Sequence, residues 1–232
     1  MEIMDTTLRD GEQTSGVSFV PHEKLQIAKK LLREVKVDRI EVASARVSEG
    51  EKQAVTDICQ WAERHGMPEA VEVLGFVDKG VSLRWNSECG GRVINLLCKG
   101  SERHCTLQLR KTPDEHLADI RREVEYAQRL GISVNVYLED WSNGMRTSEE
   151  YVYKMVDEIL TMDVRRIMLP DTLGVLDPLL AVSYFRKMRK RYPHAHFDFH
   201  AHNDYDLAIA NVSAAVLCGC CPLYTNTAAD DP

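Results

Sequence analysis

Two histidines separated by one residue, His200 and His202, are the sharpest chemical feature of the sequence. His200 ends the predicted strand 196–200 and His202 follows it by two residues, and side chains at i and i+2 of a strand point to the same side. Both imidazoles could therefore share one metal ion, with Asp10 as the best-placed third ligand. Two imidazoles and one carboxylate leave positions open for substrate and water, which is typical of a catalytic divalent ion. Two loop histidines that bind nothing remain the alternative.

Two further residues, Arg9 and Glu139, could have either a catalytic or a purely structural role. Arg9, beside Asp10, could form an ion pair at a strand end or direct a guanidinium at a carboxylate or carbonyl oxygen. Glu139 shares inward parity with Tyr137 at the end of a predicted strand, so it is a candidate general acid or base. It could equally solvate a loop.

These groups require elements that bring distant segments together. Short runs rich in β-branched residues predict strands at 3–6, 39–43, 71–77, 93–97, 134–138, 166–169 and 196–200, with a weak eighth at 222–225. Between them, capping signals and apolar periodicity predict helices, among them 21–35, 113–130 and 148–161. Capping boxes are predicted at the starts of the last two, from Thr112 to Glu115 and from Thr147 to Glu150. Strands that alternate with helices predict an α/β fold with a parallel sheet.

Eight such units would close a TIM (β/α)8 barrel, with the eighth unit incomplete because no helix follows it. A doubly wound open sheet is the rival fold. It usually carries a glycine-rich phosphate loop after the first strand, and this sequence has only isolated glycines there. The barrel is therefore favoured. Its active site would be built by the loops that follow the strands, where the polar residues concentrate.

Composition excludes several classes of protein. The chain has 232 residues, 44% of them hydrophobic and 28% charged, and a net charge of −7, which argues against nucleic acid as a partner. It has no apolar run of about 18 residues that would span a membrane. No secretory signal is present, and seven cysteines favour reduced thiols in the cytoplasm. We expect one cytoplasmic domain over residues 1–232.

The chemical residues lie within two longer motifs. The segment 5–13 (DTTLRDGEQ), with Lys24 downstream, and the segment 197–204 (FDFHAHND) resemble the two signatures of the DRE-TIM metallolyases. These are the 2-isopropylmalate, homocitrate and citramalate synthases, with hydroxymethylglutaryl-CoA (HMG-CoA) lyase as a relative. The resemblance runs from residue 2 to about residue 217, and the tail 218–232 is atypical.

The resemblance implies roles for single residues. A divalent metal (Zn, Mn or Mg) would be held by Asp10, His200 and His202. Arg9 would polarise the 2-oxo group of the substrate, Glu139 would assist deprotonation of the acetyl-CoA methyl group, and Thr172 would hold the substrate carboxylate. The implied reaction is a Claisen-type condensation of acetyl-CoA with a 2-oxo acid. The partners would be these small molecules, and we expect a homodimer.

Three segments are most similar to the citramalate synthase branch, whose 2-oxo acid is pyruvate: 37–51, 136–144 and 169–178. Strand parity agrees with a small substrate. It predicts four bulky side chains pointing inward below the metal, which leave room for a methyl group more readily than for an isopropyl group. They are Leu74, Phe76, Leu97 and Tyr137.

Other functions stay open at this point: 2-isopropylmalate synthesis from 2-oxoisovalerate, cleavage of the HMG-CoA lyase type, and a truncated, non-catalytic metal-binding fragment. The sequence departs from the family at Asp206, where glycine is usual. It also lacks the Gly-Glu-Arg-Ala-Gly-Asn segment after the eighth strand and the C-terminal domains, and its tail is unrelated. We therefore expect a barrel left open beside its first strand, with impaired catalysis or none.

Overall fold

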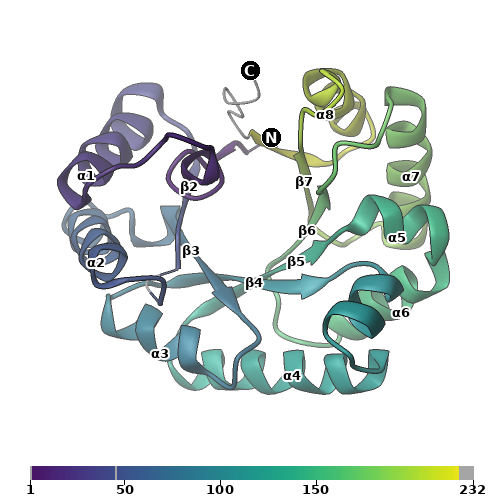
Figure 1. The fold of residues 1–232 in the computed structure, drawn as a ribbon, viewed down its shortest axis with the longest axis horizontal. Helices are drawn as coiled ribbons and strands as arrows, with labels where there is room; N and C mark the ends of the chain where they lie inside the picture. The colour runs from purple at the N-terminus through teal and green to yellow at the C-terminus, as the bar shows by residue number, and fades with distance from the viewer. Residues whose placement is uncertain (1, 45, 225–232) are drawn as a thin grey trace.

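A computed structural model describes residues 2–44 and 46–224 of the chain. Eight parallel strands follow one another in chain order around one closed barrel, which excludes the open doubly wound sheet. Figure 1 shows the helices as an outer ring around these strands. The strands are β1 (Met4–Asp5), β2 (Arg39–Val42), β3 (Val71–Phe76), β4 (Val93–Lys99), β5 (Ser133–Glu139), β6 (Arg166–Asp171), β7 (Phe197–Ala201) and β8 (Cys221–Tyr224).

Helices connect successive strands, as the alternating pattern predicts. They are α1 (Pro21–Lys30), α2 (Glu49–Arg64), α3 (Val81–Glu88), α4 (Pro113–Arg129), α5 (Trp141–Thr147), α6 (Glu149–Ile159), α7 (Pro178–Arg191) and α8 (Ala208–Leu217). A π-helical turn, Leu31–Val35, continues α1, and short helical turns lie at Gly11–Gln13, Pro68–Ala70 and His104–Gln108. None of the helices in the described ranges is long and apolar enough to cross a membrane.

The eighth strand corrects one expectation. β8 pairs with β7 on one side and with β1 on the other, so that Met4 lies opposite Leu223 and Asp5 opposite Tyr224. The open edge expected beside the first strand is therefore wrong, because backbone pairing of four residues is enough to close the barrel. Within the described residues the eighth unit consists of its strand alone. The last residue of the predicted strand 222–225 and the rest of the tail lie outside those residues.

One predicted helix start is confirmed and another is wrong. Thr112 caps α4 as predicted: its hydroxyl accepts the N–H of Glu115, and the Glu115 carboxylate accepts the N–H of Thr112. Thr147 does not cap α6 in this way. It is the last residue of α5, and its hydroxyl donates to the carbonyl oxygen of Asn143. The predicted helix 148–161 exists as α6, with Ser148 at its N-cap.

Strand side chains divide between two environments. Outward-facing apolar residues pack against the helices in two clusters, one on β2 and β3 with α1 and α2, and a larger one on β4–β7 with α3–α8. A third, smaller apolar cluster fills the middle of the barrel. It consists of Met4, Leu74, Tyr137 and Met168, with Phe76 and Leu97 packed against it.

Charged residues close the end of the barrel where the strands begin, which we call the base. Arg39 donates to Glu72 at 2.8 Å and to Asp198 at 2.9 Å. Arg166 pairs with Asp198 and with Glu2. Each member of this base cluster therefore faces an opposite charge, which offsets part of the cost of removing it from water.

Candidate active site

Three predicted metal ligands meet at the opposite end of the barrel, where the strands end, which we call the mouth. The ligand atoms of Asp10, His200 and His202 all lie within 4.8 Å of one another. His200 is on β7 and His202 directly follows it. Asp10 lies in the turn after β1, which folds back so that Thr6 O accepts the N–H of Asp10. Oδ2 of Asp10 lies 3.3 Å from Nε2 of His200 and 3.7 Å from Nε2 of His202.

The protonation states of Asp10 and His200 are those that a bound cation requires. Burial lowers the pKa of His200, and nearby Arg9 lowers it further against the opposing effect of Asp10, which favours the neutral imidazole. Burial raises the pKa of Asp10, but its contacts with His200 and Arg9 outweigh burial and hold that pKa well below its usual value. Neither ring nitrogen of buried His200 has a hydrogen-bond partner among the described residues. A neutral imidazole with an unpartnered nitrogen beside a carboxylate fits a divalent metal ion.

Arg9 is fixed beside this cluster by three partners. Its Nη1 donates to Oδ1 of Asp10 at 2.7 Å, its Nε donates to Oε2 of Glu41, and its Nη2 donates to the Tyr137 hydroxyl at 3.2 Å. Burial and the nearby Glu41 carboxylate hold the pKa of Tyr137 well above its usual value, so it stays a neutral phenol. The ring of Tyr137 also meets that of His200 edge-on. The Arg9 guanidinium is thus held in one orientation at the edge of the metal site.

A chain of buried side chains inside the barrel supports Arg9. Nδ2 of Asn135 donates to Oδ1 of Asn95 at 2.9 Å, and Nδ2 of Asn95 donates to Oε1 of Glu41 at 2.8 Å. All three are buried. These three side chains were not predicted to support Arg9. The available signal was two asparagines interrupting apolar strands with the same parity as Leu97 and Tyr137, positions where an amide needs a partner.

The inward side chains of β4 and β5 form three layers. The register pairs Asn95 with Asn135, Leu97 with Tyr137, and Lys99 with Glu139. The lowest layer is hydrogen-bonded and the middle layer belongs to the apolar cluster. In the uppermost layer Nζ of Lys99 forms an ion pair with Oε2 of Glu139. Glu139 therefore stands at the mouth, as predicted, with a lysine as its partner.

The predicted substrate residues fall into two groups. Leu74, Phe76, Leu97 and Tyr137 pack in one apolar cluster inside the barrel, and Tyr137 contacts Arg9. Thr172, directly after β6, has a separate contact: its hydroxyl oxygen accepts the N–H of Asp140 at 2.9 Å. The hydroxyl hydrogen of Thr172 remains available to another acceptor.

Gly144 lets α5 approach the end of β4, and Gly100 lets the chain after β4 approach β5. A Cβ on Gly144 would lie 2.0 Å from the carbonyl oxygen of Gly100, and a Cβ on Gly100 would lie 2.3 Å from that of Leu138. Asp140, between β5 and α5, has a left-handed φ of 66° and accepts a hydrogen bond from Ser101 at 2.7 Å. The chain therefore turns sharply after Glu139, and this close packing fixes the rim of the mouth.

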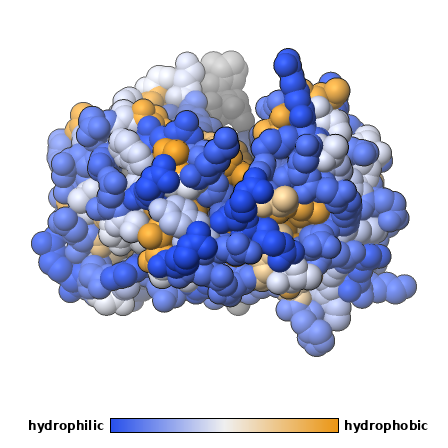
Figure 2. Space-filling model, turned by 90° about the horizontal axis from the view of Figure 1, so that it is seen from below, coloured by the Kyte–Doolittle hydropathy of each residue, from blue (hydrophilic) through white to orange (hydrophobic). Residues whose placement is uncertain are grey.

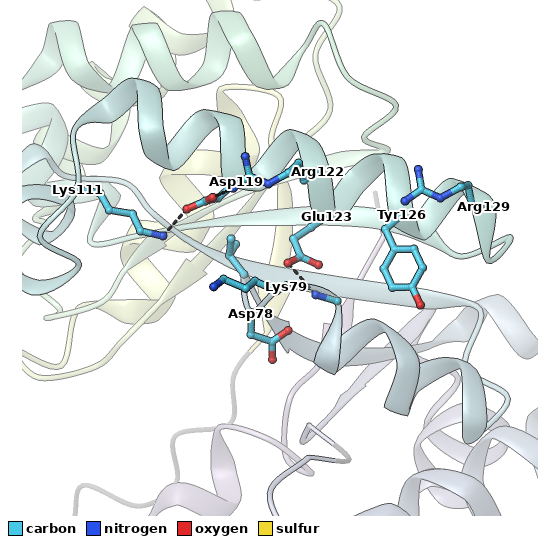
Figure 3. Close-up of a pocket in the computed structure, with 10 residues that line it drawn as sticks. Asp78, Lys79, Lys111, Asp119, Arg122, Glu123, Tyr126 and Arg129 are labelled. Carbon is cyan, nitrogen blue, oxygen red and sulfur yellow. Dashed lines mark hydrogen bonds and ion pairs between the residues drawn. The ribbon is translucent and has the colours of Figure 1, made fainter.

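A separate hollow of about 400 Å³ lies between the β3–α3 loop and α4 (Figure 3). Its charges largely satisfy one another: Asp119 pairs with both Lys111 and Arg122, and Glu123 accepts the N–H of Gly80. Figure 2 shows the side of the molecule that carries α3 and α4, and hydrophilic residues predominate there. Because none of the three metal ligands lines this hollow, the ligand chemistry, and not the size of a cavity, locates the candidate active site.

The chain is similar in sequence to several known synthases. It is 38% identical to a putative (R)-citramalate synthase of Methanopyrus kandleri and 37% identical to an (R)-citramalate synthase of Methanocaldococcus jannaschii. Each match covers 94% of this chain but only 42% and 43% of the relative, so the chain spans less than half of their length. A probable 2-isopropylmalate synthase of Ignicoccus hospitalis is 33% identical over 94% of this chain and 53% of the relative.

Solved structures agree on the fold. An HMG-CoA lyase of Bacillus subtilis matches 96% of this chain and 75% of its own, with a TM-score of 0.79 and 20% identity. The carboxyl transferase domain of Rhizobium etli pyruvate carboxylase (Y628A variant, with pyruvate) matches 99% of this chain and 40% of its own, with a TM-score of 0.74 and 17% identity. The HMGL-like family model matches residues 1–225. Together with the synthases above 30% identity, this match means that the chain belongs to the HMGL-like family, and the resemblance in its two motifs is confirmed.

Proposed function

We propose that this chain carries the site of a metal-dependent, Claisen-type condensation of acetyl-CoA with a 2-oxo acid, with pyruvate preferred and citramalate as the product. The observation that carries the proposal is the meeting of Asp10, His200 and His202 beside an Arg9 that is held from three sides. The two citramalate synthases named above support the choice of reaction.

Each site residue would have a role that follows from its place in the barrel. Asp10, His200 and His202 would hold a divalent ion, which supplies Lewis-acid stabilisation of negative charge on a 2-oxo acid. Arg9 has a fixed guanidinium with which to bind and orient oxygen atoms of the 2-oxo acid. Thr172 has a free hydroxyl hydrogen with which to bind the substrate carboxylate. In the middle of the barrel, the cluster of Leu74, Leu97 and Tyr137 would limit the size of the 2-oxo acid side chain.

Glu139 would take the proton. Its carboxylate stands at the mouth, where the methyl group of acetyl-CoA must meet the carbonyl carbon of the 2-oxo acid. Removal of one methyl proton to Glu139 lets that carbon form the new bond to C2 of the 2-oxo acid. The carbonyl oxygen then acquires a proton, and hydrolysis of the thioester releases the CoA thiol.

A thiol-release assay tests this function. The chain is loaded with Zn, Mn or Mg and supplied with acetyl-CoA and a panel of 2-oxo acids. We expect release that depends on both metal and 2-oxo acid, is highest with pyruvate, and gives citramalate. Highest release with 2-oxoisovalerate would indicate a 2-isopropylmalate synthase instead. No thiol release from acetyl-CoA, together with cleavage of HMG-CoA, would favour the lyase to which the fold is similar.

A further inference from the structure

Lys99 is an unusual lysine because it faces the inside of a barrel. It is the last residue of β4, it is buried, and its register partner on β5 is Glu139. The one other buried lysine among the described residues, Lys24, is shared by two carboxylates, Glu12 and Glu51. The ion pair of Lys99 joins it to Glu139.

The main chain of Lys99 is held by three neighbouring elements. Its N–H donates to Nε2 of His116 on α4 at 3.1 Å, and its carbonyl oxygen accepts from the Tyr151 hydroxyl on α6 at 2.9 Å. The next N–H, that of Gly100, donates to the carbonyl oxygen of Glu139 at 2.6 Å. The Lys99 side chain therefore starts from a fixed point, which reduces the entropy cost of holding a long side chain in one place.

Among the residues that the structure describes, Lys99 supplies the one ion pair of the Glu139 carboxylate. Leu97 and Tyr137 lie beneath the ion pair, and the Tyr137 hydroxyl is engaged by Arg9 and Glu41. The next residue, Asp140, directs its carboxylate to Ser101 and Asn143. Without the lysine, the Glu139 side chain would lose the contact that fixes its direction at a mouth partly open to water.

We propose that Lys99 is a positioning residue that aims the Glu139 carboxylate at the acetyl-CoA methyl group. This rests on the proposed function, in which Glu139 takes the methyl proton. A general base must lie within about 2.6–3.2 Å of the atom that bears the proton. A carboxylate that changes orientation therefore transfers the proton more slowly, while the affinity for the substrate stays the same. Lys99 therefore contributes to kcat through Glu139 and leaves binding of the 2-oxo acid unchanged.

The test uses the full chain, loaded with metal, and the variants Lys99→Met and Lys99→Arg. The matched control is Lys52→Met, because Lys52 also pairs with a glutamate, Glu88, but on the outside of the barrel between α2 and α3. Two rates are followed: thiol release, and exchange of the acetyl-CoA methyl hydrogens in D2O, with and without pyruvate. Metal content and the thermal unfolding midpoint are measured for every variant.

We expect Lys99→Met to lower methyl exchange and kcat by roughly 10- to 100-fold, a part of what a positioned base contributes. KM for pyruvate and metal content should stay at the wild-type values, Lys99→Arg should recover most of the rate, and Lys52→Met should match wild type. In a Glu139→Gln background, Lys99→Met should add no further loss, because its effect passes through Glu139.

Two results would overturn the inference: an additive loss in the Glu139→Gln background, or an unchanged kcat with a raised KM for pyruvate. Wild-type methyl exchange without thiol release would instead contradict the proposed condensation, while the exchange rates of the variants would still decide the role of Lys99. A wild-type chain with neither exchange nor thiol release would contradict both proposals.

Discussion

The two ends of the barrel use buried charge in opposite ways. At the base, Arg39 and Arg166 are matched by Glu2, Glu72 and Asp198, so every charge has a partner within the chain. At the mouth, the two ring nitrogens of His200 have no hydrogen-bond partner within residues 2–44 and 46–224, beside an aspartate that stays ionised.

This difference indicates which end of the barrel binds a ligand. A buried ion cluster whose charges are matched stabilises one arrangement of the strands and has little affinity left for a ligand. Single atoms of the base cluster also lack a hydrogen-bond partner among the described residues: Arg39 Nε, Glu72 Oε2 and Asp198 Oδ1. Each of them belongs to a group that is paired through its other atoms, whereas both ring nitrogens of His200 are left without a partner and cost free energy unless a ligand binds there. The base is therefore a structural end and the mouth a binding end, and variants at each end should fail in different measurements.

The largest expected effect is at the metal ligands. Substitution of His200→Ala or His202→Ala should each remove most of the bound divalent ion, and Asp10→Asn should weaken its binding. Elemental analysis after dialysis measures the occupancy, and His22→Ala on the exposed surface of α1 is the control. Full occupancy in both site variants would show that these histidines are not the ligands.

At the base, Arg39→Met should lower the free energy of unfolding by about 3–5 kcal/mol, because it leaves Glu72 and Asp198 buried without their main cation. Metal affinity should stay at the wild-type value. Urea unfolding measures the first and metal titration the second, with the exposed Arg64→Met as control. A large loss of metal affinity with little loss of stability would reverse the roles assigned to the two ends.

A smaller effect is the loss of stability at low pH through His116, which accepts the N–H of Lys99 at the mouth. Burial, with nearby Lys111 and Lys99, lowers the pKa of His116 to about 4. The unfolded chain, with a histidine pKa of about 6.5, binds the proton first, so stability should fall as the pH drops from about 6.5 to about 4, by up to roughly 3 kcal/mol. Urea unfolding at pH 7 and pH 4.5 should show a smaller difference for His116→Gln. An equal change in the free energy of unfolding in the wild-type chain and in His116→Gln would show that His116 does not cause the pH dependence.

The smallest effect is on substrate choice. In an apolar pocket each surplus methylene changes discrimination by roughly 1–3 kcal/mol, so kcat/KM should be higher for pyruvate than for 2-oxoisovalerate. Leu97→Ala should narrow that ratio, whereas Leu160→Ala on the outside should not. Comparable kcat/KM values for the two acids in the unaltered chain would remove the support for a methyl-sized site.

Strand parity explains why much of the mouth was predictable. Alternation places His200 and His202, or Leu97 and Lys99, on one side of a strand whatever the details of packing. The chain from Asn135 through Asn95 to Glu41 was not predictable, because its hydrogen bonds join three strands and depend on their register. The eighth strand was predicted weakly at 222–225, but its pairing with both neighbours was not predictable, since a strand of four residues carries too little pattern.

The helices after β5 show where a local sequence pattern fails to predict the start of a helix. The pattern around Thr147 resembles a helix start, yet residues 141–147 already form α5. Trp141 is fully buried and packs on Phe185, and Asp140 turns the chain through a left-handed conformation that suits few residues. Tertiary packing of one tryptophan therefore decides where the helix begins.

The contact between Gly100 and Gly144 has a consequence for anyone who surveys variants of this chain in bulk. No side chain fits at either position, since a Cβ would lie 2.0–2.3 Å from a carbonyl oxygen. In a selection for growth, both glycines would rank with Asp10 and His200 as intolerant positions, although neither touches a substrate. A parallel screen of protein abundance separates them: glycine variants should vanish from the abundant fraction, while His202 variants persist in it.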